Sequence, residues 1–253
     1  MSIQFDNAGM YLKNPDGTDT ISSSHPSRFS SSGDRWTLAC LFTRDITGGG
    51  SYQRMFSNAS NSNGTNGYEA NSTYSANDQK MTLLMAGAGA NVTVDLVDAY
   101  AVSDLVAAFF SYNYAGDEAI YASYNRSDVS LLKTSHVFNE SPSSPIPTGN
   151  SKLSIGYARW NNGKWMKGTL HRVILYNRPL GSAQMNWMAK SRFANYSRVG
   201  LVSDWRMRPR NRFNGDSIVS GDIVVDHGPA NVEFNEVQGT NAPVVVKTNS
   251  FAR

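Results

Sequence analysis

The sequence predicts an all-β fold, a jelly-roll sandwich of two antiparallel sheets with one short helix near residues 181–197. The first observation is a series of short runs in which apolar and polar residues alternate, because a period of two marks strands with one buried face. The second is a low charged fraction of 17%, compensated by Gly, Asn and Ser between these runs. Helical periodicity is confined to residues 181–197. With 253 residues, 40% of them apolar, the chain suits one large sandwich.

The first half of the chain contains four strand-like segments. They cover residues 3–15, 34–45, 53–70 and 105–125. The family resemblance described below implies that they are an opening strand pair, one long strand and two hairpins, the first with glycines at its turn. In the long strand, the residues that alternate toward one face are Trp36, Leu38, Cys40 and Phe42. Cys40 is the single cysteine of the chain, so no internal disulfide forms, and its position in this series predicts a buried structural thiol.

Residues 151–189 contain the most informative pattern. Leu153 and Ile155 begin one alternating segment, and a second follows a polar loop. The second segment contains His171, Val173 and Leu175. Pro179 prevents further ladder pairing, so the strand must end at the Asn-Arg-Pro turn. A short amphipathic helix is expected directly after it.

These motifs resemble a known family. The VILYNRPL run of residues 173–180, the SIQFDNAGMYLKNPDG opening and the DRWTLACLFTRD strand are similar to laminin-G-like, concanavalin A-like jelly rolls over residues 3–189. The resemblance implies that the opening strand pairs antiparallel with the strand at 170–176. It implies a core that includes Trp36, Leu38, Val173 and Leu175. It also places Trp165 and Trp205 at core positions, and Trp187 lies on the apolar side of the expected helix.

The resemblance divides the chain into a jelly roll at 1–198 and a C-terminal segment at 199–253. In the family, the segment that residues 199–234 resemble usually precedes the opening strand. In this chain it follows the hairpin that ends in the YNR motif. It begins a truncated second repeat or it closes the sandwich, and about 50 residues are too few for a second sandwich of this type. We therefore expect residues 223–225 and 244–246 to form short buried strands, or arms that pair with a neighbouring subunit.

The sequence shows no apolar stretch after Met1 of the kind that a signal peptide or a membrane-spanning helix requires, so synthesis in a host cytoplasm is expected. Laminin-G-like domains usually work outside cells. Bacteriophage structural proteins fit both observations, because they are made in the host cytoplasm and lysis then releases them to the outside. By this elimination, the first prediction is a non-enzymatic virion surface protein, a capsid decoration subunit that forms a homo-oligomer on the particle with other virion proteins. The alternative is a lectin-like receptor-recognition module of a phage tail or fibre that binds surface glycans.

A run of arginines predicts the partner-binding surface. Arginine occupies every second position of WRMRPRNRF, at Arg206, Arg208, Arg210 and Arg212. An extended strand would present all four on one face, and Pro209 disfavours a helix. One interpretation is contact with an acidic surface such as a capsid shell. The other is a solvated strand face with the local carboxylates Asp204 and Asp216 as partners. Nucleic-acid binding is disfavoured because the net charge is only +3.

Catalysis and a cofactor are not expected. Jelly-roll glucanases need paired carboxylates at alternating positions of one strand. The five glutamates, Glu69, Glu118, Glu140, Glu233 and Glu236, do not have that spacing. The four histidines lack metal-ligand spacing as well.

Carbohydrate binding would use an exposed aromatic ring beside amides that bind hydroxyl groups. The candidates are Trp160, Asn161, Asn162, Asn66 and Tyr68. The resemblance also allows a calcium ion at a loop rim. Its candidate ligands are Asp16, Asp19, Asp95, Asp98, Asp117 and Asp226.

Overall fold

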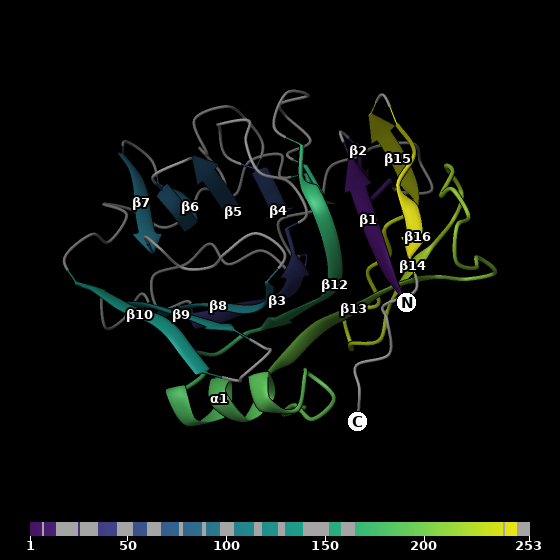
Figure 1. Cartoon of the computed structure of the whole chain (residues 1–253). Coiled ribbons are helices and arrows are strands. Elements are labelled where there is room, and N and C mark those ends of the chain that lie inside the picture. Colours follow the sequence, from purple (N-terminus) through teal and green to yellow (C-terminus); the bar gives the residue numbers. More distant parts are fainter. Residues whose placement is uncertain are drawn as a thin grey trace.

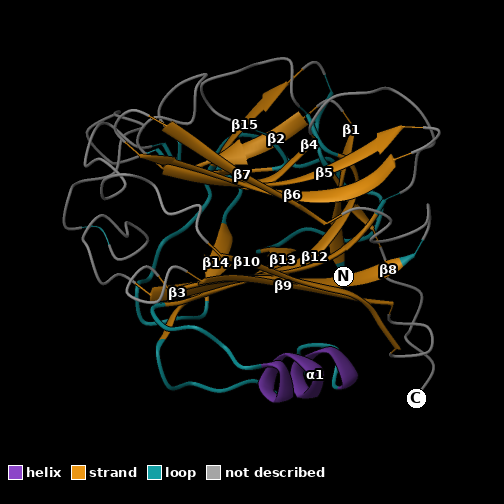
Figure 2. Ribbon diagram, turned by 90° about the vertical axis from the view of Figure 1, so that its left-hand side faces the viewer, coloured by secondary structure: helices purple, strands orange, loops and turns teal. Residues whose placement is uncertain are grey.

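The computed structural model places the strands and the helix that position the surface discussed below. It describes residues 1–6, 8–13, 25, 35–44, 53–59, 67–75, 78–87, 90–96, 104–113, 118–125, 130–138, 152–157, 165–239 and 241–246. Within these residues the chain forms two antiparallel sheets and one short helix (Figures 1 and 2). The predicted all-β, two-sheet fold is confirmed.

One sheet has nine strands. In spatial order they are β10 (Ser130–Phe138), β9 (Glu118–Asn125), β8 (Leu105–Asn113), β3 (Arg35–Thr43), β12 (Lys167–Tyr176), β1 (Ser2–Asp6) and β16 (Val244–Val246), with β13 (Leu201–Pro209) beside β12 and β14 (Val224–Asp226) beside β13. Strands β1 and β13 pair with different halves of the same edge of the long strand β12.

The second sheet has seven strands and faces the first (Figure 2). In order they are β15 (Glu236–Gly239), β2 (Ala8–Tyr11), β11 (Ser154–Ile155), β4 (Gln53–Ser57), β5 (Gly67–Ser75), β6 (Asp78–Gly87) and β7 (Ala90–Leu96). The opening segment therefore supplies one strand to each sheet, and both expected hairpins, β4–β5 and β8–β9, are present.

The expected pairing of the opening strand is confirmed. Ile3 lies opposite Leu170, and Phe5 lies opposite Gly168, in an antiparallel ladder. The apolar residues between the two sheets form the main core, as the alternation predicted. They include Trp36, Leu38, Cys40, Phe42, Val173, Leu175 and Trp205, all fully buried. Burial also raises the pKa of the Cys40 thiol, which fits the predicted structural role.

Strand β3 is buried on both faces. Its second face, with Ala39 and Leu41, packs together with Ile174 of β12 against Met185 of helix α1 (Ser182–Lys190). The helix lies on the outer side of the nine-stranded sheet, away from the other sheet (Figure 2). A strand between two apolar layers cannot alternate with polar residues, which explains its nearly continuous apolar sequence.

The helix is shorter than predicted, and one of its residues is placed differently. It ends at Lys190, because Arg192 and Phe193 adopt left-handed backbone angles with φ of 59° and 57°. Trp187 was expected on the apolar side but is 49% exposed, since Met185, Met188 and Ala189 fill the contact with the sheet. Trp165 is partly buried and stacks on Tyr157.

The C-terminal segment contributes strands to both sheets. Strand β13 pairs with β12, β15 with β2, and β16 with β1. Residues 224–226 and 244–246 thus pair within the chain, and partners in a neighbouring subunit stay a prediction. No helix in the part of the chain that the structure describes is long and apolar enough to span a membrane.

Candidate functional site: a basic groove at the end of strand β13

The predicted carbohydrate site falls mostly on residues outside the described ones, namely Trp160, Asn161, Asn162 and Asn66. Its remaining member is described, and the prediction for it is wrong. Tyr68 is 1% exposed and stacks on Trp36, with ring centroids 4.4 Å apart. It stacks on Phe56 as well, at 5.8 Å. The ring therefore belongs to the core and offers no surface to a sugar.

Strand β13 carries the first two arginines of the basic run. Arg206 and Arg208 are exposed, while Trp205, Met207 and Pro209 between and beside them are buried. This alternation is what the period of a strand predicts for one solvent-facing row. The buried residues anchor the strand, and the Trp205 indole donates a hydrogen bond to the Val232 carbonyl at 2.6 Å.

The row does not continue to Arg212. The strand ends at Pro209, and Asn211 has a left-handed backbone with φ of 59°. The turn carries Arg212 toward Asp222, and its Nε lies 2.9 Å from each carboxylate oxygen. The hydrogen bond that Arg212 donates to Asp222 raises the pKa of Arg212. The four arginines therefore do not share one face, although Arg206, Arg208 and Arg210 all remain exposed.

Arg206 also has a carboxylate partner, and that partner is buried. Asp204 is fully buried, and its carboxylate accepts hydrogen bonds from Arg172 Nε and Nη2 at 2.6 and 2.7 Å. It also accepts one from the Tyr196 hydroxyl at 3.0 Å. Arg206 Nε lies 3.3 Å away, at the exposed side. Burial alone would raise the pKa of Asp204, but the hydrogen bonds and charge of Arg172 outweigh it and hold this pKa below its ordinary value.

Arg208 and Arg210 differ from these two arginines. Within the described residues, neither has a carboxylate at ion-pair distance. The expectation of local carboxylate partners therefore applies to Arg206 and Arg212 only. Asp204 is one of the two expected partners, and Asp222 takes the place of Asp216.

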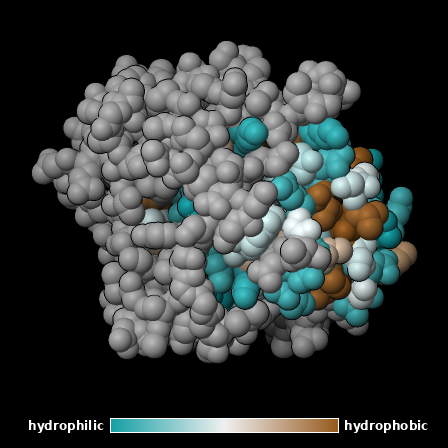
Figure 3. Space-filling model, turned by 90° about the horizontal axis from the view of Figure 1, so that it is seen from above, coloured by the Kyte–Doolittle hydropathy of each residue, from teal (hydrophilic) through white to brown (hydrophobic). Residues whose placement is uncertain are grey.

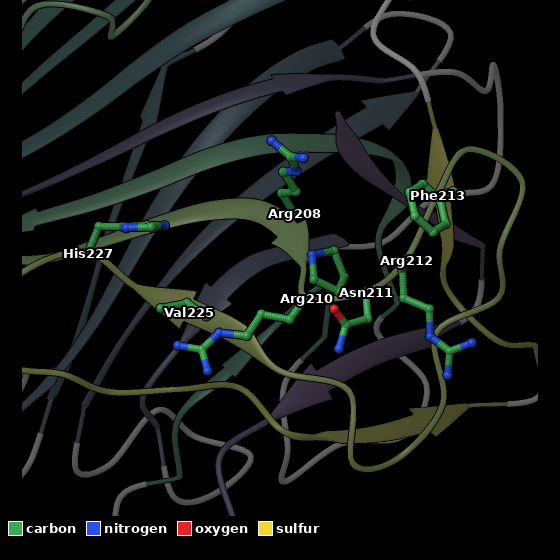
Figure 4. A pocket seen from close by; sticks show the side chains of 8 residues that line it. Arg208, Arg210, Asn211, Arg212, Phe213, Val225 and His227 are labelled. Carbon is green, nitrogen blue, oxygen red and sulfur yellow. The ribbon is translucent and has the colours of Figure 1, made fainter.

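Two adjacent hollows surround the turn after β13. The first, here called the basic hollow, has a volume of about 410 Å³. Its lining consists of Arg208, Pro209, Arg210, Asn211, Arg212, Phe213, Val225 and His227 (Figure 4). The second, here called the side hollow, has about 470 Å³ and shares residues 210–212 with the first. Gly221, Asp222 and Ile223 complete its lining.

Side chains of different chemistry lie at opposite sides of the turn. Figure 4 shows Arg210 extending toward Val225 and His227, while Arg212 points to the other side, where Phe213 stands. Phe213 is 70% exposed, so its ring is open to solvent beside the charged groups. Sequence reasoning missed it, although it directly follows the arginine run. Figure 3 shows apolar residues lying among hydrophilic ones on the described part of this face.

Backbone hydrogen bonds hold the turn in place. The Phe213 amide donates to Asp216 Oδ2 at 2.7 Å, and the Gly215 amide donates to the Val245 carbonyl at 2.8 Å. The Arg210 amide reaches the Ile223 carbonyl at 3.3 Å. The groove is therefore built on a strand end tied to β16 and to the residues before β14, so little ordering is needed on binding.

The calcium candidate that the structure describes is engaged otherwise. Asp226 Oδ1 accepts the amides of Asp204 and Gly228, and Oδ2 accepts that of Val232. This carboxylate organises the connection from β13 to β14. Among the described residues, no three metal-ligating side chains lie close enough together to hold a metal ion. Of the other candidates, Asp16, Asp19, Asp98 and Asp117 lie outside the described residues, as does the side chain of Asp95.

No protein-family model and no curated protein matches the chain. Solved structures do resemble it. The enzymatically active domain of tailspike protein 2 of bacteriophage CBA120 matches with a TM-score of 0.58 at 12% identity. The match covers 82% of this chain and 33% of that one, so the chain spans about a third of the length of that domain.

Two further matches extend the comparison. The leech intramolecular trans-sialidase matches with a TM-score of 0.53 at 12% identity, over 88% of this chain and 31% of that one. The heptameric SAP-like pentraxin of Limulus polyphemus matches with a TM-score of 0.50 at 12% identity, over 96% of both chains. At these identities the likeness concerns the fold alone. Together with the two antiparallel sheets, it identifies the chain as a jelly-roll-like all-β sandwich.

Proposed function

We propose that this chain is a non-enzymatic recognition module that binds a carbohydrate receptor, of the kind a bacteriophage carries on a tail or fibre. The observation that carries the proposal is the groove after β13, where the exposed Phe213 ring stands beside Asn211 and exposed guanidinium groups. A ring packs on the C–H face of a sugar, and amide and guanidinium groups bind its hydroxyls.

Two further observations support this proposal. Backbone hydrogen bonds hold the strand end that carries the groove, so little ordering of the protein opposes the binding of a glycan. A tailspike protein of a bacteriophage is among the solved structures with this fold, although fold alone does not fix function.

The test is a glycan array with the wild-type protein and the variant Phe213→Ala. We expect the wild type to bind at least one class of bacterial surface glycan. Phe213→Ala should weaken this binding about tenfold, because loss of an aromatic platform costs on the order of 1 kcal/mol or more. Trp187→Ala is the matched control, since Trp187 is an exposed aromatic on helix α1, outside the groove. A wild-type protein that binds no glycan contradicts the proposal.

Capsid decoration is the second candidate, and one specific observation favours it. Arg206 and Arg208 form an exposed basic row on β13, which fits an acidic protein surface as well as a charged glycan. In a parallel experiment, Arg206→Ser/Arg208→Ser would be tested for occupancy on purified particles. A salt-sensitive loss of occupancy, with an empty glycan array, would support decoration.

A further inference from the structure

The two hollows differ in charge although they share a wall. In the side hollow, Arg212 is paired with Asp222, so its positive charge is neutralised at short range. In the basic hollow, Arg208 and Arg210 have no carboxylate at ion-pair distance within the described residues. His227 adds an imidazole ring to the lining of this hollow. The half of the groove around Arg208 and Arg210 is therefore electropositive, although Arg210 lines both hollows, and the half around the Arg212–Asp222 pair is close to neutral.

In the electropositive half, the backbone that carries the two arginines is held in place. Arg208 lies on β13 between the buried residues Met207 and Pro209, and Arg210 follows with its amide bonded to the Ile223 carbonyl. A guanidinium group presents its N–H donors in a planar fork that matches the oxygens of a carboxylate or a phosphate. Val225 contributes an apolar surface beside Arg210 (Figure 4). A low-polarity neighbour strengthens an ion pair relative to open solvent.

The near-neutral half suits a different part of the same ligand. Asp222 in the side hollow accepts hydrogen bonds, and Asn211, which lines both hollows, accepts and donates them. Phe213 lines the basic hollow next to Arg212 in sequence and supplies an apolar ring. These groups recognise hydroxyls and C–H faces rather than charge. Each hollow has a volume in the range that small ligands occupy.

We infer that the ligand is an anionic glycan, in which a carboxylate or phosphate on one sugar is held by Arg208 and Arg210, and an adjacent neutral sugar lies against Phe213, Asn211 and Asp222. This inference rests on the proposed carbohydrate-binding function and specifies its ligand class. It assigns charge selection to two arginines and sugar-ring contact to the far side of the turn.

The experiment measures dissociation constants by calorimetry with three probes of equal length. One is an oligosaccharide with a single hexuronic acid, the second is its carboxyl-reduced form, and the third carries a sugar phosphate in place of the acid. We expect the wild type to bind an acidic probe at least about tenfold more tightly than the reduced form, since a hydrogen bond to a charged group contributes about that factor. The stronger of the two acidic probes identifies the source of the charge.

Two double variants locate the charge selection. Arg208→Gln/Arg210→Gln should remove the preference for the acidic probe and leave weak binding of the reduced form. Lys190→Gln/Arg198→Gln loses the same two charges at exposed positions outside the hollows and should keep the preference. Thermal unfolding of both variants checks that the fold is intact.

The outcomes separate this inference from the function on which it rests. Equal binding of acidic and reduced probes, weakened by Phe213→Ala, overturns the anionic ligand class and leaves carbohydrate binding in place. Equal losses in both double variants assign the preference to overall charge and overturn the site. Binding of no glycan at all overturns the proposed function itself.

Discussion

His171 occupies a polar position inside the nine-stranded sheet. Its Nδ1 lies 2.6 Å from Ser2 Oγ, and its Nε2 lies 2.9 Å from Thr43 Oγ1. A hydroxyl can donate or accept, so a neutral ring with one N–H satisfies both contacts. Burial lowers the pKa of His171 to about 4, with a smaller contribution from the positive N-terminal amine. The folded protein therefore holds this histidine in its neutral form.

This pKa makes stability depend on pH. The unfolded chain binds a proton at His171 below about pH 6.5, and the folded chain does so only near pH 4. The free energy of unfolding is therefore at its full value above pH 6.5 and falls as the pH decreases toward 4. We expect a loss on the order of 2 kcal/mol from this partly exposed ring, measured by urea denaturation.

His171→Gln is the control for this prediction, because glutamine keeps hydrogen-bonding capacity and does not titrate. Its stability should change less between pH 7 and pH 4.5 than that of the wild type. An unchanged slope would assign the pH dependence to other groups. Asp204 is not among these groups in this pH range, because its pKa is lowered and its contribution to stability is lost only at more acidic pH.

At the scale of single elements, strand β13 is fixed by one buried carboxylate. Asp204 joins the strand to Arg172 on β12 and to Tyr196 in the loop after the helix. Arg172 Nη1 also donates to the Phe193 carbonyl in that loop. One residue thus links β13, β12 and the residues after α1, and it lies next to the start of the exposed arginine row.

We expect Asp204→Asn to destabilise the protein by about 3–5 kcal/mol, because it leaves the nearly buried Arg172 without its counter-charge. The double variant Arg172→Met/Asp204→Leu should lose less, since it removes both charges and fills the space with apolar atoms. Chemical denaturation of Arg172→Met, Asp204→Leu and the double variant measures the coupling between the two side chains. Additive losses would mean that the two side chains stabilise the fold independently.

The alternation of apolar and polar residues predicted the strands in which every second side chain faces the core. Strands β3, β12 and β1 and the pairing of β1 with β12 follow from alternation and from the family motif. The burial of Tyr68 did not follow, because the carbohydrate-site prediction needs an exposed ring, whereas Tyr68 lies in strand β5 and packs into the core. The separate course of Arg212 depends on the left-handed Asn211, and the helix end on Arg192. Single-residue backbone states leave no periodic signal.

At the scale of the whole molecule, the N-terminal and C-terminal parts share one core. Trp205, Val224, Phe234 and Val245 are buried in the same cluster as Trp36. Trp205 packs against Phe56, with ring centroids 5.7 Å apart, and Phe56 belongs to the opposite sheet. A boundary at residue 198 therefore separates stretches of sequence whose side chains pack together.

A chain that ends at residue 198 should therefore not fold stably. It would lose the aromatic rings of Trp205 and Phe234 from the core and leave the edges of β1 and β2 without their partners β16 and β15. Circular dichroism and chemical denaturation measure the result. Cooperative unfolding of residues 1–198 alone would show instead that the jelly roll is complete without the C-terminal segment.

The pairing of β16 with β1 determines how the molecule would respond to mechanical load. Ser2 lies opposite Val246, so a pull that separates the two ends opens this ladder one pair at a time and does not shear it. Only three residue pairs resist, and β1 remains held by β12. Val245 also bonds to Gly215 and Asp216, which support the turn bearing Phe213. Tension on the C-terminal end would thus peel away the support of the groove before the sandwich itself gives way.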